Sequence, residues 1–148
     1  MVRIVLDTVI FVRCLLNPGS VWGQLVFGRR GRYGLIASEP IVEEVLEVLS
    51  RPAVQRKFRF VAGKTKSEVL DALANAEMVE VRSIPVVSRD VKDDKFLATA
   101  KTAGAAFLVT EDEDLLVLGT YDGVRIVTAA AFLAVLDATT GTATDPRR

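Results

Sequence analysis

The sequence alternates short, strongly apolar runs with longer segments in which apolar residues recur every three or four positions. "VRIVLDT" is almost continuously apolar, rich in β-branched residues and closed by a polar pair, which is typical of a strand buried on both faces. It predicts a first strand at residues 2–6, and the longer stretch "MVRIVLDTVIFVRCLL" is interpreted as a core strand followed by a turn. Similar runs predict four more strands at "LIAS", "MVEVRS", "AFLVT" and "VRIVT".

In the segments between these runs, apolar residues recur at the spacing of an α-helix. "SEPIVEEVLEVLS" has Pro40 in its first turn and an apolar stripe along one face, and residues 39–76 are predicted to be mostly helical. A second helix is predicted from Asp93 to Ala103, ended by Gly104 at the position after the helix. "AAAFLAVLDA" predicts a last helix, and the polar, breaker-rich residues 139–148 a disordered tail.

Strands that alternate with helices predict a three-layer α/β/α fold with a central, mainly parallel sheet of about five strands. A chain of 148 residues, half of them hydrophobic, suits one domain with a buried core. No apolar run approaches the roughly 20 residues that a membrane span needs. We therefore expect a cytoplasmic protein without a membrane partner.

The histidine and cysteine content of the chain limits which catalytic mechanisms and metal sites it can have. The chain has no histidine, which excludes Ser-His-Asp and Cys-His nucleophilic mechanisms and the usual zinc sites. Its one cysteine, Cys14, permits no internal disulfide and is expected to be a small buried side chain. Catalysis would have to use carboxylates, hydroxyls, Lys or Arg, with a hard cation.

Charge is divided unevenly along the chain. Residues 1–66 hold 11 Lys or Arg against 5 Asp or Glu, whereas residues 67–148 hold 8 against 14. A basic surface beside an acidic centre suits a polyanionic substrate held over metal ions. A salt-bridged, solvated surface would give the same counts.

Four acidic residues are predicted to meet at one edge of the sheet. Asp7 and Asp112 follow strands, Glu44 lies in the first turns of a helix, and Asp93 begins another helix within "RDVKDDKFLATA". Any one of these aspartates could instead be a helix cap. Together they would repel one another without a counter-charge, and Mg²⁺ or Mn²⁺ prefers such oxygen ligands.

These motifs resemble the PIN-domain ribonucleases, especially the VapC-like toxins of toxin–antitoxin pairs. The resemblance is carried, from about Val2 to Leu136, by "VLDTVIFVRCLL", "SEPIVEEVLEVLSRP", "DVKDDKFLATAKTAGAAFLVTEDEDLL" and "VRIVTAAAFL". It implies a PIN-like nuclease domain at residues 1–138 and a divalent-metal-dependent endoribonuclease.

The resemblance also implies roles for individual residues. The catalytic residues would be Asp7, Glu44, Asp93 and Asp112, with Asp7, Asp93 and Asp112 as ligands of Mg²⁺ or Mn²⁺, and Thr8, Asp94 and Asp114 as auxiliary residues. Glu44 is preferred to Glu43 because the family's glutamate directly precedes the apolar pair Val45 and Leu46.

One position departs from the family pattern. The family usually has Asn two residues after the first aspartate, and this chain has Val9. The missing amide would normally steady Asp7, so weaker metal binding or lower activity is expected.

The family resemblance and the basic residues together suggest which molecules this protein binds. An RNA substrate, an antitoxin protein and a homodimer are implied, with Trp22 or the helical segment 51–76 as the dimer contact. The residues that could track RNA phosphates or stack on bases are Arg29, Arg30, Arg32, Arg51, Arg56, Lys57, Arg59, Lys64, Lys66, Tyr33, Phe58 and Phe60.

Three alternatives stay open at this point. Haloacid-dehalogenase-like phosphatases need a second Asp where Val9 stands, and two-component receivers need an Asp at the end of the third strand, where "MVEVRS" has none. Both fit worse than the nuclease. The third alternative is a PIN-fold RNA-binding or assembly module with weak or no nuclease activity.

Overall fold

Strand β1 (Arg3–Leu6) lies inside the sheet, between β2 (Gly34–Ala37) and β4 (Phe107–Val109), and runs parallel to both. Its residues Ile4, Val5 and Leu6 are almost completely buried, because helices cover both faces of the sheet at this point. This explains why the sequence here is continuously apolar rather than alternating.

The computed structural model describes residues 1–58 and 63–143. The helical elements are α1 (Thr8–Leu16), α2 (Val21–Gly23), the π-helical η1 (Gln24–Gly28), α3 (Glu39–Ser50), α4 (Pro52–Phe58), α5 (Gly63–Ala74), the 3₁₀-helical η2 (Val91–Asp93), α6 (Asp94–Ala103), α7 (Glu113–Leu116) and α8 (Ala129–Ala143). The remaining strands are β3 (Glu77–Met78), β5 (Thr120–Tyr121) and β6 (Val124–Val127).

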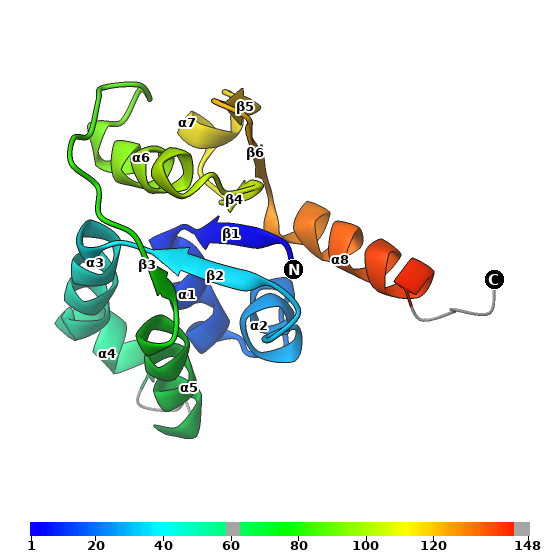
Figure 1. Cartoon of the computed structure of the whole chain (residues 1–148). Helices are drawn as coiled ribbons and strands as arrows, with labels where there is room; N and C mark the ends of the chain where they lie inside the picture. The colour runs from blue at the N-terminus through cyan, green and yellow to red at the C-terminus, as the bar shows by residue number, and fades with distance from the viewer. Residues whose placement is uncertain (59–62, 144–148) are drawn as a thin grey trace.

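The sheet has the order β3-β2-β1-β4-β6-β5, with every neighbouring pair parallel except β5 and β6. Helix α6 packs on one face against β1, β2 and β4, and α1 and α5 lie on the other (Figure 1). The predicted three-layer α/β/α fold with a mainly parallel sheet is confirmed. The parallel strands end at one edge, where the chain turns into α1, α3, α7 and α8.

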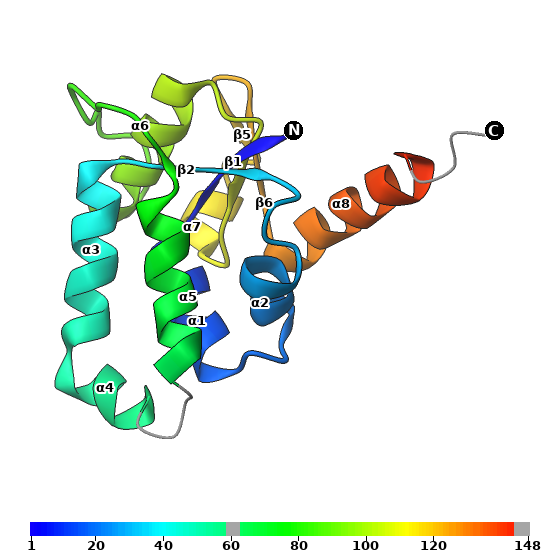
Figure 2. The same ribbon diagram turned by 60° about the horizontal axis from the view of Figure 1, so that its bottom comes forward.

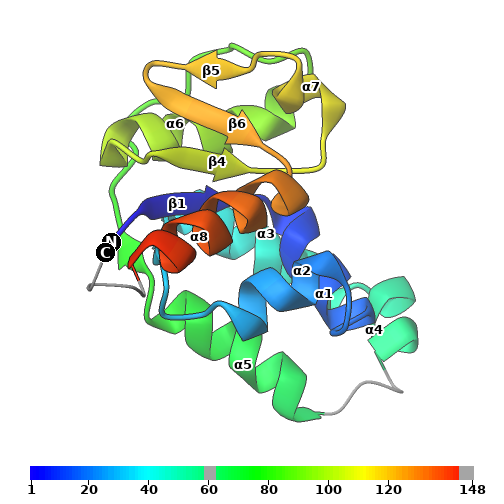
Figure 3. The same ribbon diagram turned by 90° about the vertical axis from the view of Figure 1, so that its right-hand side faces the viewer.

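Helix α8 leaves the end of β6 and projects from the body of the domain in Figures 1 and 2. Figure 3 is turned so that this side faces the viewer, and α8 lies there in front of the sheet. Its first turns are anchored by Phe132, which is fully buried and packs against the rings of Tyr33 and Phe107. Among residues 1–58 and 63–143, no single helix has the length and apolar composition to cross a membrane, and only the bent pair Thr8–Leu16 and Val21–Gly28 meets that test jointly.

Four details differ from the sequence predictions. The prediction of a third strand along "MVEVRS", residues 78–83, is wrong beyond its first residue, because β3 is only Glu77–Met78 and residues 79–83 form no helix or strand. Residues 8–16 form helix α1 rather than a turn, because Asp7 caps the helix through the backbone N–H of Val9. The short strand β5 was missed; it joins β6 through a turn at Asp122 and Gly123, both with positive φ, as a two-residue hairpin turn requires. Helix α8 continues to Ala143, so residues 139–143 of the expected tail are helical, and residues 144–148 lie outside the described residues.

Helix α6 begins and ends close to the prediction. It runs from Asp94 to Ala103 after one 3₁₀ turn, and Gly104 takes the left-handed conformation at φ 64°. The predicted glycine stop of this helix is therefore confirmed.

Gly23 is required by a close approach of the backbone. A Cβ atom at this position would lie 1.9 Å from the carbonyl oxygen of Pro18, whereas a Cβ at Gly28 would meet no atom within 4 Å. We expect Gly23→Ala to destabilise the fold by about 1–3 kcal/mol, since an overpacked backbone must shift. Urea unfolding should show a clearly lower midpoint for Gly23→Ala and a nearly unchanged one for the control Gly28→Ala; equal midpoints would contradict the expectation.

Candidate active site

Asp7 stands at the carboxyl end of β1 and is buried, with 5% of its surface exposed. Its Oδ2 accepts a hydrogen bond from the Thr110 hydroxyl at 2.7 Å, and its Oδ1 accepts one from the backbone N–H of Val9 at 3.4 Å. The Thr110 hydroxyl in turn accepts the backbone N–H of Asp112 at 3.0 Å. Thr110 therefore links the ends of β1 and β4 and holds the two acidic residues at one edge of the sheet.

Asp93 and Asp112 form a close acidic pair. Burial, a hydrogen bond with Asp112 and the charges of Asp112, Asp7 and Asp90 raise the pKa of Asp93 from 3.8 to about 7. The second oxygen of Asp93, Oδ2, is buried without a hydrogen-bond partner. Burial likewise raises the pKa of Asp7, against the hydrogen bonds from Thr110 and Val9, and the charges of Glu44 and Asp112 add to the rise.

Glu44 joins this group from helix α3. Its Oε2 accepts a short hydrogen bond from the Thr8 hydroxyl, and its Oε1 forms an ion pair with the Lys95 ammonium at 2.6 Å. Because Thr8 follows Asp7 directly, Glu44 is held beside Asp7.

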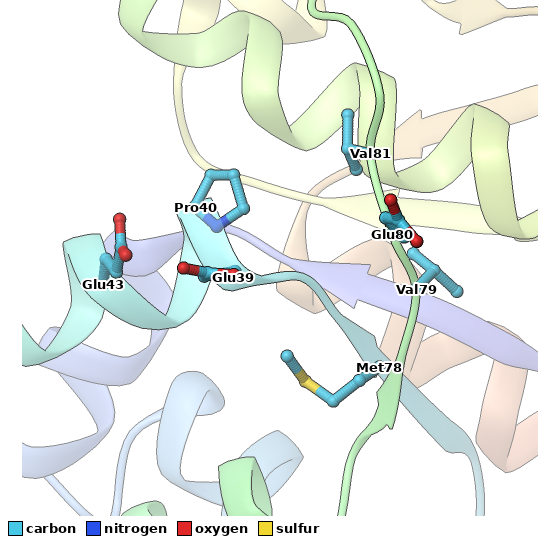
Figure 4. Close-up of a pocket in the computed structure, with 7 residues that line it drawn as sticks. All are labelled: Glu39, Pro40, Glu43, Met78, Val79, Glu80 and Val81. Carbon is cyan, nitrogen blue, oxygen red and sulfur yellow. The ribbon is translucent and has the colours of Figure 1, made fainter.

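Glu43, the alternative to Glu44, lies elsewhere. It lines a pocket of about 450 Å³ together with Glu39, Pro40 and residues 78–81. Figure 4 shows Glu43 with Glu39 and Pro40 on the first turns of α3, across from the chain that leaves β3. The two neighbouring glutamates therefore face different surroundings, and Glu44 is the one beside Asp7.

Asp94 has a structural position. It is 1% exposed and accepts the backbone N–H groups of Ser88 and Val87 at 2.7 and 3.2 Å. It thereby ties the segment before η2 to the start of α6.

Asp114 extends the acidic group on the exposed side. One ligand atom each from Asp90, Asp93 and Asp114 lies within 4.8 Å of the others. The guanidinium of Arg89 pairs with Asp114 at 2.9 Å.

The structure thus brings Asp7, Glu44, Asp93 and Asp112 together at the predicted edge, and their catalytic and metal-binding roles stay predictions. The sequence reasoning missed four neighbouring residues: Arg89, Asp90, Lys95 and Thr110. Asp90 and Lys95 lie in the same charged stretch, "RDVKDDK", whose charge pattern indicates a polar surface but does not show that Lys95 contacts Glu44, 51 residues away. Thr110 carries no comparable signal, since a threonine at the end of a strand is common.

The predicted RNA-tracking residues find other partners. Arg29 pairs with Asp137, Arg30 with Asp71, and Arg51 with Glu47. The prediction that Tyr33 stacks on a base is wrong, because Tyr33 is 7% exposed and donates its hydroxyl to the carbonyl of Leu25. Arg59 and Phe60 lie outside the described residues, as do the side chains of Phe58 and Lys64.

The donor chemistry of the group fits a divalent metal ion. Among the described residues, the acidic ligand atoms that all lie within 4.8 Å of one another belong to Asp90, Asp93 and Asp114, and of these only Asp93 was predicted as a metal ligand. All the donor atoms of Asp7, Asp93 and Asp112 are carboxylate oxygens, which hard cations prefer. The unpartnered Oδ2 of Asp93 and the raised pKa values of Asp7 and Asp93 indicate excess negative charge at a buried position. A cation bound there would relieve both features.

Comparison with known proteins agrees with the observed fold. A sequence profile of the PIN domain matches residues 3–114. Among solved structures, PAE2754 from Pyrobaculum aerophilum is 14% identical with a TM-score of 0.57, over 93% of this chain and 90% of that one. VapBC2 from Rickettsia felis, bound to a DNA fragment from its promoter, is 11% identical with a TM-score of 0.55, over 84% and 96%. No curated protein matches the sequence.

The acidic group should make the metal-free protein less stable as pH rises. The folded pKa of Asp93, about 7, exceeds the ordinary value of 3.8, so between these values the folded state binds more protons than the unfolded state and the free energy of unfolding falls. We expect the Tm in chelator to be lower at pH 8 than at pH 5, and Asp93→Asn to lose most of this decline. The chain has no histidine, so few other groups titrate in this range.

Glu43→Gln is the matched control for that experiment, because it also removes one carboxylate but at an exposed position. It should keep the full decline. Equal pH profiles for Asp93→Asn and the unchanged protein would contradict the assigned cause.

Proposed function

This chain belongs to the PIN-domain family, and we propose that it is a divalent-metal-dependent endoribonuclease that hydrolyses RNA phosphodiesters. The observation that carries the proposal is the convergence of four carboxylates at one sheet edge, where burial and the neighbouring carboxylate of Asp112 raise the pKa of Asp93 to about 7. A purely structural cluster would gain nothing from such repulsion.

Asp7, Asp93 and Asp112 would hold Mg²⁺ or Mn²⁺. Such an ion, when bound, lowers the pKa of its water and polarises a phosphate, which a histidine-free site needs for hydrolysis. Thr110 orients Asp7 through its hydroxyl, and Thr8 orients Glu44. Asp94 holds the segment that carries Arg89 and Asp90.

Arg89 is well placed to bind a phosphate of the substrate. Its side chain is 67% exposed, and its guanidinium lies against Asp114 at the rim of the acidic group. A guanidinium binds phosphate through two parallel hydrogen bonds. RNA held there would lie next to the carboxylates despite their charge.

We further propose that the protein acts in the cytoplasm with an antitoxin as partner. Support comes from the VapBC2 structure, which is bound to a DNA fragment from its promoter, and from the shared fold.

Self-association also stays a prediction. The exposed side chains of Leu46, Leu70 and Met78 line an apolar groove of about 340 Å³ between α3 and α5. These two helices lie side by side in Figure 2, and α5 belongs to the segment predicted to supply the dimer contact.

Asp7→Asn should abolish cleavage without unfolding the protein. Asn is as good a helix cap as Asp, so α1 keeps its start, while the site loses one ligand charge. RNA cleavage should fall by more than about 100-fold, since even groups behind a metal ligand contribute 10–100-fold. Chelation should have the same effect and be reversed by added Mg²⁺ or Mn²⁺.

Glu43→Gln again serves as control and should cleave normally. Cleavage that persists in excess chelator, or a folded Asp7→Asn variant with full activity, would overturn the proposed nuclease. A protein that binds RNA and metal but never cleaves would instead be the RNA-binding or assembly module.

Val9→Asn should strengthen metal binding by restoring the family's usual amide near Asp7. Val9 is 39% exposed and its backbone N–H already contacts Asp7. We expect a gain in Mn²⁺ affinity of roughly 10-fold, the lower end for groups behind a ligand. Titration calorimetry measures this, with Leu16→Asn, which is 38% exposed near the other end of α1, as a control that should bind like the unchanged protein.

A further inference from the structure

Lys95 forms an ion pair with Glu44, one of the four carboxylates of the candidate site. Among the described residues, no other ion pair is found to Asp7, Glu44, Asp93 or Asp112. The Lys95 ammonium lies 2.6 Å from Glu44 Oε1 and donates to the carbonyl of Lys92 at 2.7 Å. The other oxygen of Glu44 accepts the Thr8 hydroxyl. Both oxygens of Glu44 therefore already have partners from the protein.

The Lys95–Glu44 pair is partly shielded from solvent. The two side chains are 18% and 27% exposed, compared with 57% and 59% for the surface pair Arg51–Glu47. Surface pairs are weak because water and salt screen them. The Lys95 ammonium is screened less and is held by two acceptors, so it is a fixed feature of the site.

The position of this ammonium matters because of the charges around it. Glu44 is close enough to Asp7 to raise the pKa of Asp7. Many phosphodiester-cleaving sites place two divalent ions about 3.5–4 Å apart among such carboxylates. Here one end of the acidic group, at Glu44, is neutralised by a side chain of the protein itself.

We propose that Lys95 replaces a second divalent cation, so that the site binds one ion through Asp7, Asp93 and Asp112 while Glu44 contacts Lys95 instead of metal. This inference rests on the proposed metal-dependent function. Lys95 is a positioning residue, since it acts through Glu44. This role would also explain why a lysine stands at position 95 in "DVKDDK", since capping of the helix does not require one.

The test counts bound metal ions rather than cleavage. The full-length protein is titrated with Mn²⁺ by calorimetry, and bound Mn²⁺ is followed by electron paramagnetic resonance, where two neighbouring ions broaden each other's signal. The unchanged protein should bind one ion. Lys95→Met, which keeps an unbranched side chain of similar length but removes the charge, should bind two, with the broadened signal of a coupled pair.

Three variants separate this effect from a general change in charge. Lys95→Arg keeps the charge and should bind one ion. Lys92→Met removes an exposed lysine three residues away and should also bind one. The double variant Lys95→Met/Glu44→Gln should return to one ion, because the second site needs the Glu44 carboxylate.

Several results would overturn the inference: two ions in the unchanged protein, one ion in Lys95→Met, or two ions in Lys92→Met. Lys95→Gln gives the same test should Lys95→Met not fold, which circular dichroism reveals. A protein that binds one Mn²⁺, and two after Lys95→Met, yet never cleaves RNA would support the role of Lys95 and overturn only the nuclease. A protein that binds no Mn²⁺ would overturn both.

Discussion

The register between β1 and β4 is the constraint on which the candidate site depends. Leu6 lies opposite Val109, and the next backbone N–H, that of Asp7, donates to the carbonyl of Val109 at 3.0 Å. This sets Asp7 beside Thr110, whose hydroxyl then reaches both Asp7 and the backbone of Asp112. A slip of one residue would turn these side chains to the opposite face of the sheet, so the apolar packing of two buried strands positions the carboxylates.

The same aspartates serve the fold and the site. Asp7 and Asp112 cap α1 and α7 through backbone N–H groups, so the helix-cap interpretation holds for both, and a role as metal ligand stays a prediction. Asp93 differs, because its side chain makes no capping hydrogen bond and Asp90 caps that turn instead. Among the described carboxylates of the site, Asp93 therefore combines the absence of a capping hydrogen bond with a pKa raised to about 7. Its ionised form should lower the stability of the fold, as the Tm experiment tests.

Periodicity predicted the sheet, its direction and helix α6 because buried strands and a glycine-ended amphipathic helix leave local signals. Helix α1 was not recognised, since its residues 8–16 are apolar on nearly every side and resemble the strand before them; only the cap at Asp7 separates the two. The four main carboxylates followed from strand ends and family resemblance. Lys95 and Thr110 could not be assigned in this way, because their importance lies in contacts with Glu44 and Asp7, which are 51 and 103 residues away in sequence.

The two outer strands of the sheet, β3 and β5, are each only two residues long. An edge strand exposes unpaired N–H and C=O groups that can recruit a strand from another chain, and short edges with charged side chains suppress this. Here Glu77 of β3 is also tied to Arg3 by two hydrogen bonds, which places a charged pair along that border. The sheet thus offers little template for strand addition, and contacts with other proteins should be made through helices, with a correspondingly low tendency toward cross-β aggregation from the folded state.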